Sequence, residues 1–141
     1  MQARRVNADF TVCDQIDVDD VFEIARLGYR SIVCNRPDAE APGQTTYQEI
    51  AAEAQRLGLE TRFQPIVSGH LSDQDGQEFK SIINELEGPT LAYCAAGVRC
   101  IVLWSLAQAG ERPTAEIIAE ARAAGFDLTA LVPRIDALAQ S

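Results

Sequence analysis

Metal-ligating residues are scarce in this sequence. His70 is the only histidine, and the four cysteines, at positions 13, 34, 94 and 100, include no C-x-x-C pair. Because a zinc site needs four such ligands at short spacings, we expect neither a metal nor another cofactor. We expect a cytoplasmic protein, in which four cysteines without a pairing pattern are free thiols rather than disulfides.

The sequence also has no long apolar segment and few basic residues. No run approaches the roughly 20 apolar residues of a membrane span, and the first residues lead into polar positions such as Asn7 and Asp9. We therefore expect no membrane association and no secretion signal. The 12 basic residues are outnumbered by 21 acidic ones, which gives a net charge of -9. Since a phosphate backbone needs a basic surface, nucleic acid is not an expected partner.

Strand-like and helix-like periods alternate along the 141 residues, of which 47% are apolar. A chain of this length forms one hydrophobic core, so we predict a single domain over residues 1–141. The alternation predicts an α/β fold with a mostly parallel central sheet of about four strands flanked by helices. The predicted strands cover residues 10–13, 29–34, 59–67 and 90–94. Pro65 places the third of these at an edge of the sheet or near a strand end.

Helix caps and glycine stops separate these strands. Helices are predicted to start at Asp17, Thr45 or Thr46, Ser72 and Pro113. Residues 101–106 are apolar on most sides, which indicates a buried helix. In the last segment, residues 127–140, Pro133 interrupts the helical pattern, so two short helical pieces are expected.

The loop between the fourth predicted strand and the apolar helix carries the candidate chemistry. It reads Cys94-Ala95-Ala96-Gly97-Val98-Arg99. The strand delivers Cys94 to the carboxyl edge of the sheet, where ligands bind in open α/β folds. Gly97 and the small residues let backbone N–H groups converge on one point, as in an anion-binding nest. The residues expected to line the substrate site are Ala95, Ala96, Gly97, Val98 and Cys100.

Cys94 and Arg99 are the predicted catalytic residues. Converging amides, a helix N-terminus and a guanidinium all favour a thiolate, so the pKa of Cys94 should lie below the roughly 8.5 of a free cysteine. Arg99 can hold two oxygens of an oxyanion at once. The alternative is that Cys94 is an ordinary buried thiol at a strand end, as we expect for Cys13 and Cys34.

Other candidate site residues have plainer alternatives. Arg36 follows the second predicted strand at the same sheet edge and is a candidate for anion binding, or else a solvated arginine beside a turn. Asp73 and Asp75 are candidate general acids for phosphoester cleavage, although both also suit the first turn of a helix. His70 is placed to border the site, with a solvated loop histidine as the alternative.

Several motifs together resemble the phosphatase-like domain family of beta-lactamase-hydrolase-like proteins, from about residue 10 to residue 110. They are Ile32-Val-Cys-Asn-Arg-Pro-Asp38, Gly43-Gln44, Pro65-Ile66-Val67, Tyr93-Cys94-x-x-Gly97-x-Arg99 and Leu103-Trp104-x-Leu106-Ala107. The resemblance implies a dual-specificity-phosphatase-like fold and a thiolate enzyme. It also implies one of two activities, phosphatase or rhodanese-like sulfurtransferase, the second with a persulfide dioxygenase as partner.

Two positions depart from the family pattern. Ala95-Ala96 stands where Arg-Ser is common, which removes one positive charge from the mouth of the site. Cys100 stands where Ser or Thr is usual. A thiol at this position suggests a resolving role, in which Cys100 attacks an oxidised Cys94, against the alternative of a small core residue at the start of a helix.

The length of the loop bears on the reaction. Four residues separate Cys94 from Arg99, whereas tyrosine and dual-specificity phosphatases have five, and rhodaneses use a six-residue loop that begins with cysteine. The shorter loop favours a sulfurtransferase that takes sulfur from thiosulfate or a glutathione persulfide through a Cys94 persulfide. The alternatives are a phosphatase with a phosphocysteine intermediate and an inactive oxyanion-binding or redox-sensing module. The expected partner is thus a small anionic sulfur donor or a phosphoester.

Overall fold

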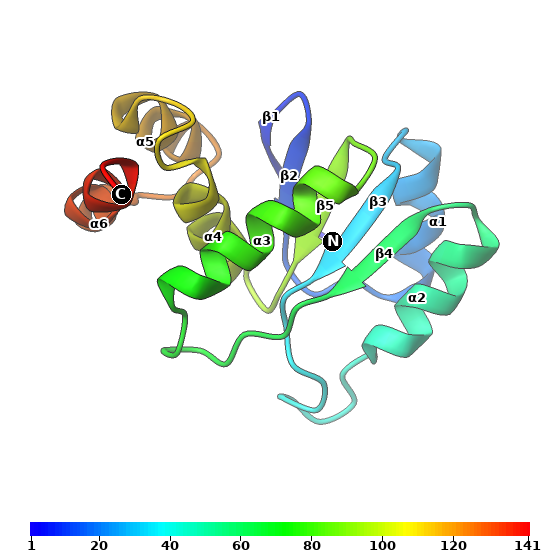
Figure 1. Cartoon of the computed structure of the whole chain (residues 1–141). Coiled ribbons are helices and arrows are strands. Elements are labelled where there is room, and N and C mark those ends of the chain that lie inside the picture. Colours follow the sequence, from blue (N-terminus) through cyan, green and yellow to red (C-terminus); the bar gives the residue numbers. More distant parts are fainter.

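A five-stranded sheet lies at the centre of the computed structural model, which describes residues 1–141 (Figure 1). The strands are β1 (Ala3–Asn7), β2 (Phe10–Cys13), β3 (Ser31–Cys34), β4 (Glu60–Phe63) and β5 (Thr90–Tyr93), in the order β1-β2-β5-β3-β4. β1 is antiparallel to β2, and all other pairs are parallel. The predicted α/β fold with a mostly parallel sheet is confirmed, and β5 occupies its middle.

The two edge strands differ most from the sequence prediction. β1 was not predicted, because its Ala-Arg-Arg start is exposed and shows no apolar alternation; only Val6 in it is buried. β4 is the opposite edge and ends at Phe63, four residues earlier than predicted. Pro65 has no N–H to donate to a neighbouring strand. It lies just beyond the end of this edge strand, which agrees with the prediction that it marks a sheet edge or a strand end.

Helices cover both faces of the sheet (Figure 1). α1 (Val18–Arg26) and α2 (Tyr47–Arg56) pack on one face. The other face is covered by α3 (Asp73–Glu85), α4 (Val98–Gln108), α5 (Thr114–Ala123) and α6 (Val132–Ala139). A short 3-10 helix, Thr129–Leu131, precedes α6, so the two predicted helical pieces are present. Pro133 lies in the first turn of α6, where its missing N–H has no intrahelical partner to lose. None of the helices is long and apolar enough to cross a membrane.

The predicted apolar helix, α4, is the most buried helix of the fold. Seven of its 11 residues are buried, among them Trp104, whose ring stacks on Phe10 of β2 with centroids 6.0 Å apart. β2, β3 and β5 are buried along their whole length because helices cover both of their faces. The end of β5 and the start of α4 are therefore fixed on all sides, which holds the loop between them in place.

Gly76 allows α3 and α4 to pack closely. A Cβ atom at this position would lie 2.8 Å from Cβ of Leu106, an atom that cannot move without α4. We predict that Gly76→Ala lowers the free energy of unfolding by about 1–3 kcal/mol, measured by urea denaturation, despite the higher helix propensity of alanine. Gln77→Ala, at the next and exposed position of the same helix, is the control. An unchanged or higher stability of Gly76→Ala would show that the helices have room to separate.

Candidate active site

The chain makes a tight turn between β5 and α4. Cys94 follows the last residue of β5, and its N–H donates to the carbonyl of Cys13 at 3.3 Å. Gly97 adopts φ +87°, a conformation that L side chains rarely take, and α4 starts at the next residue. The predicted sequence of strand, glycine loop and buried helix is thus confirmed.

The Cys94 sulfur is buried and surrounded by hydrogen-bond donors. The N–H of Gly97 lies 3.2 Å from it. The Cys100 thiol and the N–H groups of Cys100, Ala96 and Arg99 also donate, and together they lower the pKa of Cys94 from 9.0 to about 5, although burial opposes this. The Cys100 thiol contributes most. Cys94 is therefore a thiolate at neutral pH, as the loop pattern predicts.

The thiols of the other three cysteines stay protonated at neutral pH. Burial raises the pKa of Cys100 well above 9.0, and the neighbouring Cys94 raises it further. Burial and Asp14 raise the pKa of Cys13 to about 12, and burial also raises that of Cys34. All three side chains lie in the hydrophobic clusters, which agrees with the predicted core role of Cys13 and Cys34.

The guanidinium of Arg99 is held by two segments that are distant in the sequence. Its Nη1 donates to Oε2 of Glu40 at 2.7 Å and to the carbonyl of Ile66 at 2.8 Å, and its Nη2 donates to Oε1 of Glu40 at 3.0 Å. The neighbouring charge on the Cys94 sulfur also raises the pKa of Arg99. The predicted catalytic pair, Cys94 and Arg99, thus lines one cavity, and the two groups influence each other electrostatically.

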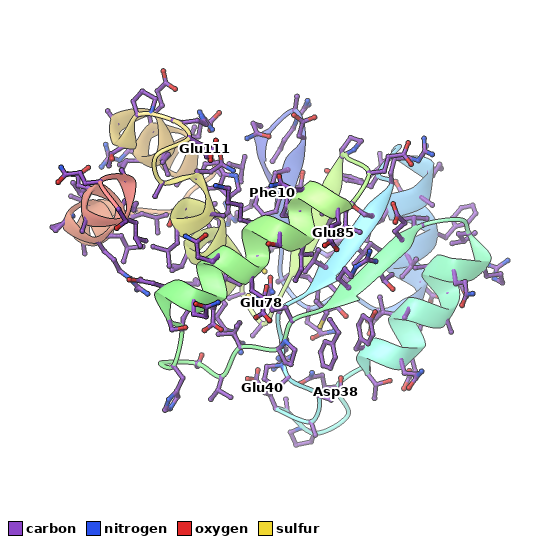
Figure 2. The ribbon with its side chains drawn as sticks, in the orientation of Figure 1. Phe10, Asp38, Glu40, Glu78, Glu85 and Glu111 are labelled. Atoms are coloured by element: carbon purple, nitrogen blue, oxygen red, sulfur yellow. The ribbon has the colours of Figure 1, made fainter.

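Glu40 is the site residue that the sequence did not predict. Figure 2 shows it in the loop that joins β3 to α2, beyond the carboxyl end of the sheet. Hydrogen bonds from Arg99 and then from Arg36 lower the pKa of its carboxyl from 4.5 to about 2. The only local signal for this role is the Arg36-Glu40 spacing in a Pro/Gly-rich loop, because the pair with Arg99 spans 59 residues.

Arg36 lies behind Glu40 rather than at the reacting sulfur. Its Nε donates to Oε1 of Glu40 at 2.8 Å and its Nη1 to Oε1 of Gln15 at 3.1 Å. Its side chain is 13% exposed, and it is not among the residues that line the cavity over Cys94. The structure therefore gives Arg36 a contact with Glu40, and through it with Arg99, while its direct contact with an anion stays a prediction.

The two candidate general acids have partners of their own. Oδ1 of Asp73 pairs with Nε of Arg134 at 2.6 Å, and Oδ2 of Asp75 accepts from the N–H of Ser72 at 2.8 Å in a capping box at the start of α3. Neither aspartate lines the cavity over Cys94, and His70 does not line it either. Both aspartates lie in the first turn of α3, as their alternative role predicts, and no carboxyl group is among the residues that line the cavity.

A cavity of about 380 Å³ opens over Cys94. Its lining residues are Ser68, Gly69, Leu71, Cys94, Ala95, Ala96, Val98, Arg99 and Val102. It therefore brings together most of the predicted loop residues with the segment that follows β4. Nowhere do three His, Cys, Asp or Glu side chains lie in a group that could hold a metal ion.

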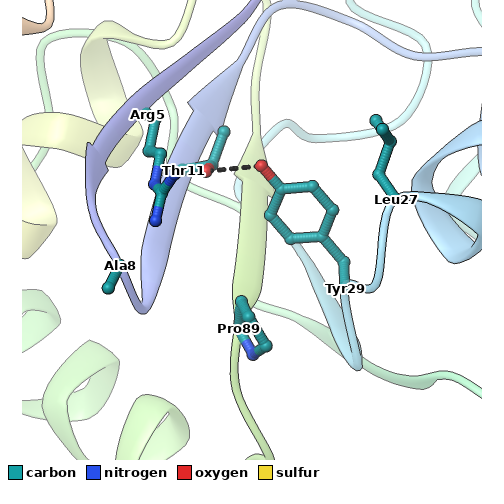
Figure 3. Close-up of a pocket in the computed structure, with 6 residues that line it drawn as sticks. All are labelled: Arg5, Ala8, Thr11, Leu27, Tyr29 and Pro89. Atoms are coloured by element: carbon teal, nitrogen blue, oxygen red, sulfur yellow. Dashed lines mark hydrogen bonds between the residues drawn. The ribbon is translucent and has the colours of Figure 1, made fainter.

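A second cavity, of about 290 Å³, lies at the amino ends of the strands (Figure 3). It is lined by Arg5, Ala8, Thr11, Leu27, Tyr29 and Pro89. The hydroxyl groups of Thr11 and Tyr29 are 2.7 Å apart and hydrogen-bond to each other. No cysteine and no carboxylate lines this cavity, so it offers neither a thiolate nucleophile nor a carboxyl acid.

Comparisons with known proteins define the class. The family model of the beta-lactamase hydrolase-like protein, phosphatase-like domain, matches residues 2–111, and the chain belongs to that family. The beta-lactamase hydrolase-like protein of Xylella fastidiosa (strain Temecula1 / ATCC 700964) is 34% identical over 125 residues, which are 87% of this chain and 29% of that protein. The chain thus spans about three tenths of the length of this curated relative.

Solved structures share the fold. A proposed phosphatase from Neisseria meningitidis Z2491 has a TM-score of 0.82 and 33% identity, and the match covers 95% of this chain and 96% of that one. TpbA of P. aeruginosa, in a complex with phosphotyrosine, has a TM-score of 0.69 at 14% identity, over 98% of this chain and 88% of that one. The phosphatase-like fold expected from the motifs is confirmed.

Removal of the Cys100 thiol should make Cys94 a weaker acid. We predict that Cys100→Ala raises the pKa of Cys94 above its value of about 5, because the largest stabilising contact of the thiolate is lost. The midpoint of the pH dependence of Cys94 alkylation by iodoacetamide, followed by mass spectrometry, measures this change. Cys13→Ala, on the other face of the sheet, is the control and should leave the midpoint in place. An unshifted midpoint in Cys100→Ala would contradict the assignment.

The same contact allows a test of the resolving role of Cys100. Peroxide converts the Cys94 thiolate to a sulfenic acid, and attack by the Cys100 sulfur would then form a disulfide and release water. Peptide mapping after mild peroxide treatment should find a Cys94–Cys100 bridge. Accumulation of sulfinic acid at Cys94 without any bridge would exclude this role and leave Cys100 as a hydrogen-bond donor only.

Proposed function

We propose that the domain is a cysteine-dependent phosphatase that acts through a phosphocysteine at Cys94. The observation that carries the proposal is the thiolate, stabilised by loop amides and the Cys100 thiol and lining the same cavity as the Arg99 guanidinium. Membership of the phosphatase-like family supports it. So does the fold shared with TpbA, whose described complex contains phosphotyrosine.

The first chemical step is attack of the Cys94 sulfur on phosphorus. An S–P bond forms and the P–O bond to the leaving group breaks, with the electron pair going to the leaving oxygen. Arg99 has five N–H groups, of which three are engaged by Glu40 and Ile66. The remaining two and the loop amides would hold the phosphoryl oxygens as charge develops.

The second step regenerates the enzyme. Water attacks phosphorus, the S–P bond breaks, and inorganic phosphate leaves the Cys94 thiolate behind. No carboxyl group lines the cavity to protonate the leaving oxygen in the first step. The leaving group should therefore be one that is stable as an anion, so that aryl phosphates react faster than alkyl phosphates.

Sulfur transfer is the second candidate, and two observations favour it. The loop has four residues between Cys94 and Arg99, and the cavity offers no general acid, which this reaction does not need. The Cys94 thiolate would attack the sulfane sulfur of thiosulfate, forming a Cys94 persulfide and releasing sulfite. Cyanide would then take the sulfur as thiocyanate and restore the thiolate.

One pair of assays tests both candidates. The parent protein, Cys94→Ser and the control Cys13→Ser are incubated with an aryl phosphate and, separately, with thiosulfate plus cyanide. We expect phosphate release by the parent and the control, and a loss of about a thousandfold or more in Cys94→Ser. Thiocyanate without phosphate release would overturn the phosphatase and support the second candidate. If neither phosphate nor thiocyanate forms, both candidate activities would be overturned, and a non-catalytic oxyanion-binding module would be favoured.

A further inference from the structure

The walls of the cavity over Cys94 are apolar. Six of its nine lining residues are hydrophobic, and Arg99 carries the only positive charge among them. Val98, at the start of α4, is 53% exposed, and Val67, next to the lining residue Ser68, is 58% exposed. Large exposed aliphatic side chains beside a nucleophile are a feature of ligand-binding surfaces, because water alone is a poor partner for them.

The positive charge available to a ligand is small. Glu40 pairs with both terminal nitrogens of Arg99 and also with Arg36. Its negative charge therefore compensates one of the two positive charges of these arginines. Two N–H groups of Arg99 remain, next to the Cys94 sulfur. This set accommodates one small oxyanion. A second anionic group on the same molecule would meet no further cation on the cavity wall and would face a chain with a net charge of -9.

The size of the cavity is compatible with an organic body. A cavity of about 150 Å³ holds a benzene ring. The volume of about 380 Å³ over Cys94 therefore has room for a ring or a branched alkyl group in addition to the reacting oxyanion. The group that bears the reacting atom must lie along these walls, because Cys94 lines this cavity and any molecule that it attacks enters there.

We infer that the substrate of this site carries a single small anionic group on an uncharged, apolar body, such as an aryl or branched alkyl group. Polyanions, nucleotides and acidic peptides are disfavoured by the same walls. The inference rests on the proposed role of Cys94 as the attacking nucleophile, whether on phosphorus or on sulfur. Val98, whose side chain forms part of the wall, is the position that sets this preference.

Alkylation of Cys94 tests the apolar wall without relying on either enzymatic activity. The rates with N-benzylmaleimide and with iodoacetamide are measured by mass spectrometry for the parent, Val98→Asn and Phe22→Asn. Both reagents are neutral, so the ratio of their rates does not depend on the fraction of thiolate. We expect the ratio to fall about fivefold in Val98→Asn, since an apolar contact with the ring is lost. Phe22, 58% exposed on α1 and outside the cavity, is the matched control and should leave the ratio unchanged.

The outcomes separate this inference from the proposed function. An unchanged ratio in Val98→Asn, or faster turnover by the parent of nucleoside polyphosphates than of phenyl phosphate, would overturn the apolar substrate class even if phosphate is released. A fallen ratio with no phosphate or thiocyanate formed would support the apolar wall while the proposed reactions fail.

Discussion

The negative charge on the Cys94 sulfur is the constraint on which the rest of the site depends. Burial alone would keep this sulfur protonated, since a low-dielectric interior disfavours an ion. The donors from the loop and from Cys100 reverse that preference and bring the pKa to about 5. They converge only because Gly97 adopts a left-handed conformation and α4 starts immediately after it. The charge, the turn and the helix start are therefore one structural unit.

The fold supports this unit from both sides. β5 lies in the middle of the sheet and α4 is buried, so neither end of the loop is free to move. Glu40 connects the loop after β3 to this unit through partly buried ion pairs with Arg36 and Arg99. Such a network orients the guanidinium toward the sulfur before any substrate arrives, which is how electrostatic preorganisation contributes to catalysis.

Local patterns in the sequence were sufficient to predict the central unit. Short patterns of a few residues each predict the apolar strand, the glycine turn at Gly97 and the apolar helix. The position of Cys94 follows from these elements. The partners of Arg99 were beyond such patterns, because Glu40 and Ile66 reach it through the strand order of the sheet. Asp73 shows the same limit, since its pair with Arg134 is 61 residues away. β1 was missed because an exposed edge strand has little apolar signal.

The ionisation of Cys94 tests most directly whether the loop holds a negatively charged sulfur. The ultraviolet absorbance of thiolates is recorded against pH for the parent and for Cys94→Ser. The difference between the two titrations gives the ionisation of the Cys94 sulfur alone. We expect a single transition with a midpoint of about 5 and a full thiolate at neutral pH. A midpoint near the roughly 8.5 of a free cysteine would show that the loop does not hold the charge, and the proposed reactions would lose their nucleophile.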